Sequence, residues 1–214
     1  MIVKLLDRTT LCTAAIGAKL CIGKEWGGGD EAAYLKTLIQ RGHESVLEHV
    51  VYVFEVQGLS RACLQQLARH RHISLSVKST RWALKEHAAY YIPPEMLNED
   101  RDEYDRRVED MIESGKRLGS KYGNDVGKYP LPECLQTDLI LTLNLRELRH
   151  IYKLRTGRTA MLEFQHLAKA LVACLPDDEQ ELVRYRSDAL ERAVQEFLET
   201  GTDETRERLE RMVE

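Results

Sequence analysis

Alternating apolar and polar positions along the chain predict three β-strands. Residues 1–7 (MIVKLLD) form a short apolar run, and residues 50–58 (VVYVFEVQG) combine β-branched and aromatic side chains, which is typical of strands. Residues 135–144 (LQTDLILTLN) resume the two-residue rhythm after prolines interrupt the pattern. Asn144 ends the third predicted strand.

Capping residues mark the starts of three predicted helices. Asp30, Ser60 and Asn144 each offer a side-chain oxygen to the first turn of an amphipathic segment, and Gly157 is expected to end the helix that Asn144 begins. The helix after Ser60 carries Gln66 towards a basic segment. The helix after Asp30 is predicted at residues 31–41, and further helices are predicted at residues 10–20, 159–175 and 177–199.

A charged segment, about residues 94–122, predicts a long outer helix. Its apolar residues have the spacing of one helix face. They are Met96, Leu97, Tyr104, Val108, Met111 and Ile112.

Composition indicates a single α/β domain covering residues 1–214. The hydrophobic fraction of 43% is ample for a core, and the formal net charge of -4 gives no global attraction to nucleic acid. No stretch approaches the ~20 apolar residues of a membrane span, and the start lacks the apolar core of a signal peptide, so we expect a cytoplasmic protein. Five cysteines without CxxC spacing indicate neither zinc nor disulfides.

The densest positive charge lies in residues 69–81, RHRHISLSVKSTR. Arg69 and Arg71 always keep their charge, so their closeness favours a phosphate or carboxylate between them. A solvated basic face is the alternative. The amphipathic helix before the run and the half-apolar SLSV within it favour an anion site at a packed helix end.

A second candidate anion site begins at Asn144, in NLRELRHIYKLRTG. An arginine in the first turn adds to the free N–H groups and the dipole of a helix N-terminus, which both favour negative charge. Two anion sites in one chain suggest a nucleotide ligand. The polar face of this predicted helix carries Arg146, Arg149, His150 and Lys153.

Four ordered motifs resemble the signature of flavin-dependent thymidylate synthases. Residues 43–49 (HESVLEH) resemble the family's HE(T/S)xxEH segment, and Gln66 lies three residues before the arginine motif. That motif, residues 69–79, reads RHR, seven residues, then Ser. NLR at 144–146 precedes LRTG at 154–157 with the family's spacing. Chance agreement of four ordered matches is improbable.

The resemblance implies an α/β (α+β) fold with a central, mostly antiparallel sheet flanked by helices. It implies a homotetramer with active sites shared between subunits and one FAD per site. The implied reaction converts dUMP to dTMP, with 5,10-methylenetetrahydrofolate as carbon donor and NADPH as reductant. By resemblance Arg155 is the catalytic residue, because a guanidinium near N3 and O2 stabilises the enolate-like anion that makes C5 of uracil nucleophilic. The alternative for Arg155 is a helix C-terminal cation beside Gly157.

The same resemblance implies two sets of ligand-binding residues. Hydroxyl groups, backbone N–H groups and arginines suit phosphate, and the Gln66 amide suits a base edge or sugar. The predicted FAD site comprises Ser45, Arg69, His70, Arg71, Val77, Asn144, Leu145, Arg146 and His150. The predicted dUMP site comprises Gln66, Leu67, Ala68, Arg69, Val77, Lys78, Ser79, Thr80, Arg81, Lys128 and Arg155.

The sequence departs from the family pattern at three positions. Lys128 replaces a common arginine and so loses the bidentate fork, Val77 stands where many members have glutamate, and Thr159 where many have histidine. We interpret these as traits of a subgroup. Neither arginine segment contains a cysteine, and Cys134 is predicted to be structural, so reduction depends on a bound flavin rather than on a thiolate nucleophile.

Three other functions fit parts of the sequence. A metal-dependent hydrolase would draw on His43, Glu48, His49, His70 and His72, although arginines flank His70 and repel a cation. A nucleic-acid-binding module would use residues 69–81, but the chain has few aromatic residues and a negative net charge. A related flavin-dependent pyrimidine nucleotide hydroxymethylase would have the same site residues.

Overall fold

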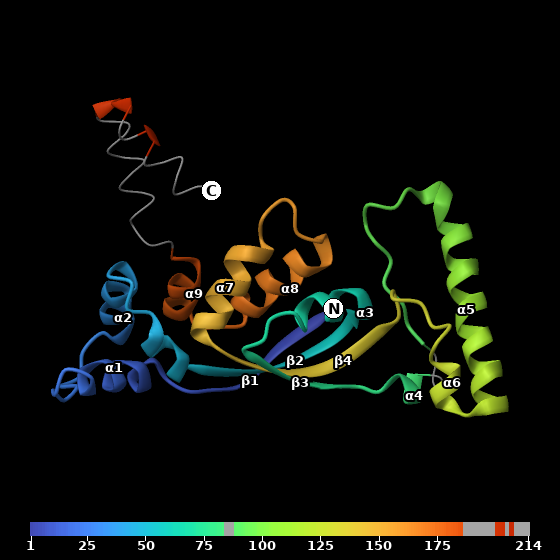
Figure 1. The fold of residues 1–214 in the computed structure, drawn as a ribbon, viewed down its shortest axis with the longest axis horizontal. Coiled ribbons are helices and arrows are strands. Elements are labelled where there is room, and N and C mark those ends of the chain that lie inside the picture. The colour runs from blue at the N-terminus through green and yellow to red at the C-terminus, as the bar shows by residue number, and fades with distance from the viewer. Residues whose placement is uncertain (84–87, 186–199, 204–205, 208–214) are drawn as a thin grey trace.

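The computed structural model describes residues 1–83, 88–185, 200–203 and 206–207. Helices lie over and beside one antiparallel sheet, which agrees with the expected fold class (Figure 1). The sheet order is β1-β2-β4-β3, and all three neighbouring pairs are antiparallel. The strands are β1 (Ile2–Arg8), β2 (Val51–Ser60), β3 (Ile73–Val77) and β4 (Gln136–Asn144).

Three strands match the sequence prediction, and β3 was missed. Its residues alternate Ile, Ser, Leu, Ser and Val, a strand pattern that is short and lies inside the basic segment. β3 is an edge strand that pairs with β4 from Ile73 opposite Leu143 to Val77 opposite Leu139. The RHR residues 69–71 therefore precede an edge strand, and the predicted dUMP-binding residues 78–81 follow it.

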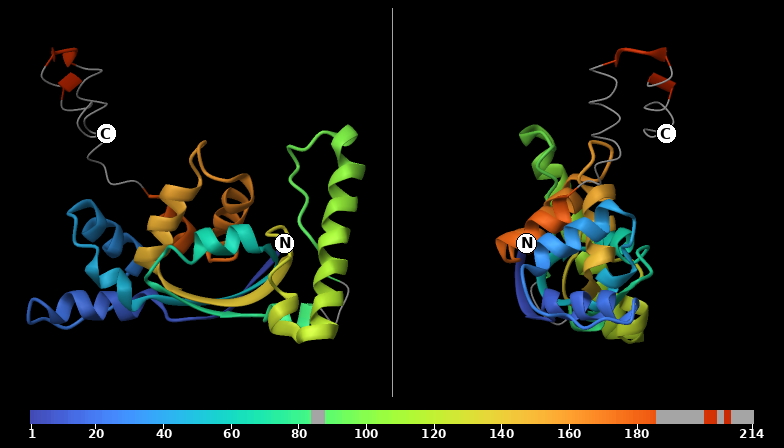
Figure 2. Two further views of the ribbon diagram at one scale, coloured as in Figure 1. Left: turned by 45° about the vertical axis from the view of Figure 1, so that its right-hand side comes forward. Right: turned by 90° about the vertical axis from the view of Figure 1, so that its left-hand side faces the viewer.

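The alternation in β2 places one of its faces in the main core. Tyr52, Phe54 and Val56 are fully buried, and Leu141 of β4 lies opposite Phe54. Helices cover this face, as the two views of Figure 2 also show. They are α3 (Arg61–Leu67), α7 (Leu145–Arg155) and α8 (Leu162–Ala173).

All three predicted helix caps are confirmed. The carboxylate of Asp30 accepts a hydrogen bond from the Ala33 N–H, and the Ser60 hydroxyl accepts one from the Cys63 N–H. The Asn144 side-chain oxygen accepts from the Glu147 N–H at 2.9 Å. The remaining helices of this part of the fold are α1 (Leu11–Leu20), α2 (Glu31–Gln40), the short 3-10 helix η1 (Ser45–His49) and α9 (Asp177–Arg184).

Several helix boundaries differ from the prediction. α7 ends at Arg155, two residues before Gly157, and its C-cap residue is Thr156, whose N–H donates to the Tyr152 carbonyl. α8 begins only at Leu162. Of the helix predicted at 177–199, the structure describes the part that forms α9, and residues 186–199 lie outside the described residues.

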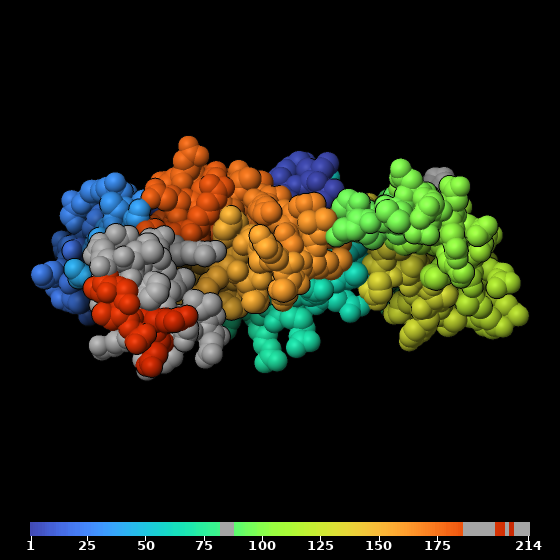
Figure 3. Space-filling model, turned by 90° about the horizontal axis from the view of Figure 1, so that it is seen from above, coloured from blue at the N-terminus to red at the C-terminus, as the bar shows by residue number. Residues whose placement is uncertain are grey.

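The charged segment folds into a lobe at one end of the molecule, green to yellow-green in Figure 3. The outer helix is shorter than predicted, because two prolines and a 3-10 turn, η2 (Asn98–Asp100), precede it. Met96 and Leu97 therefore lie before the helix. The lobe contains α5 (Arg101–Tyr122), α6 (Asn124–Gly127) and α4 (Thr80–Ala83).

The lobe has its own small apolar cluster. Val108 and Ile112 of α5 pack with Leu135, whereas Met111, which was predicted on the same face, is 43% exposed. Leu135 immediately precedes β4, so the cluster joins the lobe to the sheet. The single-domain organisation stays a prediction.

A close backbone contact holds α6 against α5. A Cβ atom on Gly127 would lie 2.5 Å from the carbonyl oxygen of Gly115 and 2.7 Å from the Cα of Gly119. Only glycine fits there, since both neighbours are backbone atoms that cannot turn away. This contact fixes the residues on either side of Gly127, including Asp125 and Lys128.

No helix in the described parts of the chain is long and apolar enough to cross a membrane.

Candidate active site

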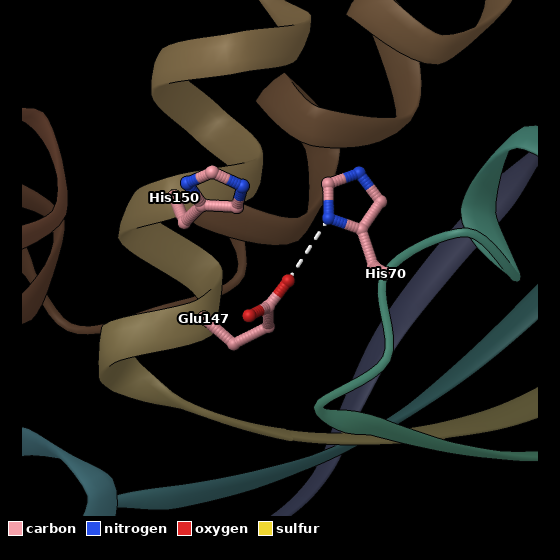
Figure 4. Close-up of side chains that lie close together, drawn as sticks. All are labelled: His70, Glu147 and His150. Carbon is pink, nitrogen blue, oxygen red and sulfur yellow. Dashed lines mark hydrogen bonds and ion pairs between the residues drawn. The ribbon is translucent and has the colours of Figure 1, made fainter.

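A buried histidine links the two ends of α7. His70, in the loop after α3, and Glu147, in the first turn of α7, point toward one another (Figure 4). Their side chains are 4% and 9% exposed, and Nδ1 of His70 lies 2.9 Å from Oε1 of Glu147. On the other side of the ring, Nε of Arg155 donates to Nε2 of His70 at 3.1 Å.

The donors and acceptors determine the protonation of this histidine. Because an arginine Nε–H can only donate, Nε2 of His70 is the acceptor and Nδ1 carries the proton that Glu147 accepts. Burial lowers the pKa of His70 below its usual 6.5, the hydrogen bond that His70 donates to Glu147 opposes that shift, and the charge of Arg155 adds to it. The ring is therefore neutral at pH 7.

Arg155 is held by three elements of the fold. Its guanidinium lies over the ring of Phe164 in α8, 4.8 Å from the centroid, and its Nη1 is 3.5 Å from Oε1 of Gln66 in α3. The amide nitrogen of Gln66 in turn lies 3.7 Å from the sulfur of Met161. A partly buried cation with its plane fixed is suited to recognise a flat, electron-rich ligand.

The position of α8, and with it Phe164, depends on a buried carboxylate. Glu163 is 2% exposed and accepts hydrogen bonds from both the backbone N–H and the hydroxyl of Ser60. Ser60 also caps α3, so one residue fixes the start of α3 and the start of α8. The two helices that flank Arg155 are thereby tied together.

Arg155 does not serve as a helix cap. Its donors go to His70 and Gln66, and the last turn of α7 is closed by Thr156, whose N–H and hydroxyl both donate to the Tyr152 carbonyl. These hydrogen bonds leave no capping contact for Arg155, and its catalytic role stays a prediction.

Two arginines of α7 form ion pairs with the HESVLEH segment, residues 43–49. Arg146 Nη1 lies 2.6 Å from Oε1 of Glu48, and Arg149 lies 3.5 Å from Glu44 while also donating to the Leu182 carbonyl. The side chain of Arg149 is only 10% exposed, so this part of the predicted polar face is covered by other elements of the fold. Those elements are η1 and α9.

The predicted FAD residues partly converge on a shallow groove of about 360 Å³. Arg71 and Asn144 both line it, and their guanidinium and amide donors suit the phosphates and polar edges of a dinucleotide. Three further predicted residues are exposed. Arg69 lies two residues before Arg71, and Arg146 and His150 lie on α7, which begins after Asn144. The groove is lined by Val51, Arg71, His72, Ile73, Ser74, Thr142, Leu143 and Asn144.

Other members of the predicted FAD set take different positions. Ser45 is the exposed first residue of η1, and Val77 ends β3. Leu145 is fully buried in the main core, and its N–H donates to the Val50 carbonyl. The structure thus gives Leu145 a packing role. The ring of His150 lies 5.7 Å from that of His70.

The predicted dUMP residues fall into two groups. Gln66 and Arg155 lie together over the sheet, where Leu67 is buried and Ala68 and Arg69 are exposed. The second group follows β3: Lys78, Ser79, Thr80 and Arg81, with Lys128 beyond α6.

The second group is organised around one carboxylate. Arg81 Nε lies 2.8 Å and Lys128 Nζ 3.1 Å from the same Oδ1 of Asp125. The carbonyl of Lys78 accepts from a guanidinium nitrogen of Arg61 at 2.9 Å, which fixes the loop that carries Ser79. Two predicted phosphate-binding cations therefore lie side by side.

Sequence reasoning missed Glu147, Phe164 and Asp125. A signal for Glu147 was present, because it is the one acidic residue on the buried face of α7 among Leu145, Leu148 and Ile151. No local signal marks Phe164, whose role depends on the packing of α8 beside α7.

The metal-hydrolase alternative is not favoured. In the parts of the chain that the structure describes, the one group of three or more metal-type ligands is His70, Glu147 and His150, which excludes His43, Glu48, His49 and His72 from it. Both nitrogens of His70 already face Glu147 and Arg155. Burial raises the pKa of the Cys134 thiol, which likewise disfavours a thiolate nucleophile there.

The fold and these contacts define an α+β protein with an antiparallel sheet and two clusters of basic side chains, one around Arg155 and one around Asp125. A family model described as "Thymidylate synthase complementing protein" matches residues 4–177. The flavin-dependent thymidylate synthase of Wolinella succinogenes is 36% identical over 200 residues, which cover 85% of this chain and 97% of that protein. The Campylobacter jejuni (strain RM1221) enzyme of the same name is 37% identical over 193 residues, covering 83% and 93%. The chain belongs to the family of flavin-dependent thymidylate synthases.

Solved structures agree with this assignment. A crystal structure of thymidylate synthase X from Helicobacter pylori with FAD and dUMP has a TM-score of 0.69 and 30% identity, and the match covers 86% of this chain and 97% of that one. A second structure of that enzyme, also complexed with FAD and dUMP, has a TM-score of 0.71 and 32% identity over 86% and 98%.

Proposed function

We propose that this protein converts dUMP to dTMP as a flavin-dependent thymidylate synthase with Arg155 as its catalytic residue. The observation that carries the proposal is the fixed guanidinium of Arg155, held by His70, Gln66 and the face of Phe164. The family membership and the FAD and dUMP named for the Helicobacter pylori structures support it.

The proposed overall reaction balances with a folate and a nicotinamide. dUMP, 5,10-methylenetetrahydrofolate, NADPH and one proton give dTMP, tetrahydrofolate and NADP. The C5–H bond of uracil breaks and releases a proton, and a carbon–carbon bond forms from C5 to the methylene carbon. Both C–N bonds between that carbon and the folate break, the two folate nitrogens take up the released and the consumed proton, and one hydride reduces the carbon to a methyl group. When bound, FAD supplies the hydride chemistry between NADPH and this carbon.

Arg155 stabilises the charge that develops on the uracil ring. Its Nε is taken by His70, so the Nη donors are the ones directed at substrate oxygen and nitrogen. A cation at N3 and O2 favours the enolate-like form and so places electron density on C5. Phe164 and His70 keep the guanidinium from turning, which removes the reorganisation cost from the reacting state.

FAD is proposed to bind along the groove beside β3. Arg71 and Asn144 line the groove, and Arg69, Arg146 and Ser45 complete the donor set. At about 360 Å³ the groove is near the lower end of ligand pockets and is smaller than a dinucleotide needs. A second subunit would provide the remaining surface.

The two groups of dUMP residues also support a shared site. In the first group Gln66, which Arg155 contacts, precedes β3, whereas the second group follows it, and five strand residues span roughly 17 Å. A single dUMP therefore does not bridge both groups of one chain easily. We propose that Arg155 and Gln66 of one subunit face Arg81 and Lys128 of another in a homotetramer.

The test is an Arg155→Ala variant assayed for tritium release from C5-labelled dUMP. We expect release to fall by at least about 100-fold while FAD content stays normal. Lys153→Ala, on an exposed position of the same helix, is the matched control and should behave as wild type. Normal turnover by Arg155→Ala would overturn the mechanism. Mass analysis of the product separates a methyl from a hydroxymethyl group.

A further inference from the structure

Glu147 is the residue of this site whose burial has no packing explanation. The other buried positions of α7 are Leu145, Leu148 and Ile151, so an apolar side chain would suit the same face. A buried carboxylate is costly unless a specific partner compensates for its lost hydration. Nδ1 of His70 is that partner, at 2.9 Å.

We infer that Glu147 is a positioning residue that fixes the tautomer of His70, and through it the orientation of Arg155. Arg155 Nε–H can only donate, so it needs a lone pair on Nε2 of His70. A neutral imidazole has that lone pair only when Nδ1 carries the proton, and Glu147 selects this form by accepting that proton's hydrogen bond.

Loss of the acceptor would reverse the interaction at the other end of the ring. With no partner at Nδ1, the proton can move to Nε2, and two N–H donors would then face each other at the 3.1 Å separation of Arg155 Nε and His70 Nε2. The guanidinium would turn away from His70. Because it lies over Phe164, a turn also moves its Nη donors relative to the substrate.

A metal ion does not fit the same three ligands as well. His70, Glu147 and His150 offer ligand atoms within 4.8 Å of one another. A cation bound to Nδ1 of His70 would, however, force the remaining proton onto Nε2, against the donor of Arg155. The hydrogen-bonded tautomer gives both ring nitrogens of His70 a matching partner, and the metal does not.

This inference deepens the proposed function and rests on the role of Arg155. Its test uses the full-length FAD-loaded protein labelled with ¹⁵N-histidine. We expect the ¹⁵N shifts of wild-type His70 to report an Nδ1–H tautomer. A wild-type Nε2–H tautomer would overturn the inference without any variant.

Two substitutions separate the tautomer from the charge. In Glu147→Gln the amide oxygen still accepts from Nδ1, so we expect the same tautomer and a kcat for tritium release within about 3-fold of wild type. In Glu147→Leu we expect the Nε2–H tautomer and a kcat lower by about 100-fold, as for a misplaced catalytic group. The KM for dUMP should change far less than kcat in both.

The outcomes also separate this inference from the proposed function. If Arg155→Ala keeps tritium release, the proposed function of Arg155 fails, whatever the tautomer. If Arg155→Ala is inactive but Glu147→Leu has wild-type kcat with retained FAD, only the positioning role of Glu147 fails. Equal losses in Glu147→Gln and Glu147→Leu, with the tautomer unchanged, would also contradict it.

Discussion

Arg146 lies at the N-terminus of α7 with its Nη1 2.6 Å from Oε1 of Glu48, so the arginine predicted to bind the flavin is already half of an ion pair. Both side chains are about half exposed, at 50% and 48%. One edge of the planar guanidinium faces Glu48, and the other remains directed away from it. The ion pair orients Arg146 and leaves other N–H donors of its guanidinium available to a ligand.

This geometry predicts different effects for the two partners. Arg146→Ala should weaken FAD binding by about 10-fold or more, because a charge-assisted hydrogen bond to the cofactor is lost. Glu48→Gln should change FAD affinity by less than about 3-fold, as expected for an exposed ion pair. Flavin fluorescence titration of the apoprotein measures both. Equal losses of FAD affinity in the two variants would mean that Arg146 stabilises η1 and does not bind the cofactor.

A second prediction concerns Asp125, which contacts both Arg81 and Lys128. Arg81→Ala should raise the dissociation constant for dUMP by about 10-fold or more. Asp125→Asn removes a negative charge beside the same cations, so it should leave dUMP binding unchanged or tighten it by up to about 3-fold. Calorimetric titration with dUMP measures these constants. If Asp125→Asn weakens dUMP as much as Arg81→Ala does, the carboxylate is essential for orienting the cations.

The close approach of α6 to α5 predicts a stability effect. Gly127→Ala places a Cβ against backbone atoms of Gly115 and Gly119 and should lower the free energy of unfolding by about 1–3 kcal/mol. The shift of α6 should also raise KM for dUMP, since Lys128 follows it directly. Gly27→Ala, which meets no atom within 4 Å, is the control. Equal unfolding temperatures for Gly127→Ala and Gly27→Ala would contradict this contact.

The neutral form of His70 predicts an acid limb in the pH profile. Burial holds the pKa of His70 below 6.5. As the pH falls through that lowered pKa, Nε2 gains a proton that faces Arg155, so kcat for tritium release should decline below pH 6.5 and not above it. The charged groups facing the ring are Glu147, Arg155 and His150.

The groups around His70 also predict how a substitution shifts the acid limb of the pH profile. The hydrogen bond and charge of Glu147 raise the pKa of His70, so Glu147→Gln should move the acid limb to lower pH. Glu181→Gln, an exposed carboxylate paired with Lys36, should leave the limb in place. A limb that stays fixed in Glu147→Gln would assign it to another group.

Local patterns predicted much of the fold. The caps at Asp30, Ser60 and Asn144 depend on residues three positions away, so sequence alone finds them. β3 and the true start of α5 were missed, because a short strand pairs with a partner distant in sequence and because prolines override apolar spacing.

The site was predicted as separate motifs and not as contacts. The motifs indicated Arg155 and His70, but their hydrogen bond joins residues 85 positions apart. The burial of Glu147 and the position of Phe164 under Arg155 depend on how α7 and α8 pack over the sheet. Such relationships arise from tertiary packing, which spacing along one segment does not encode.

The most direct test of the synthase activity is a visible absorption experiment on the purified protein under anaerobic conditions. Flavin bands should bleach with NADPH in the presence of dUMP, and should recover on addition of 5,10-methylenetetrahydrofolate with stoichiometric formation of dTMP. A protein that takes up no FAD, or a flavin that recovers without dTMP, would contradict the account.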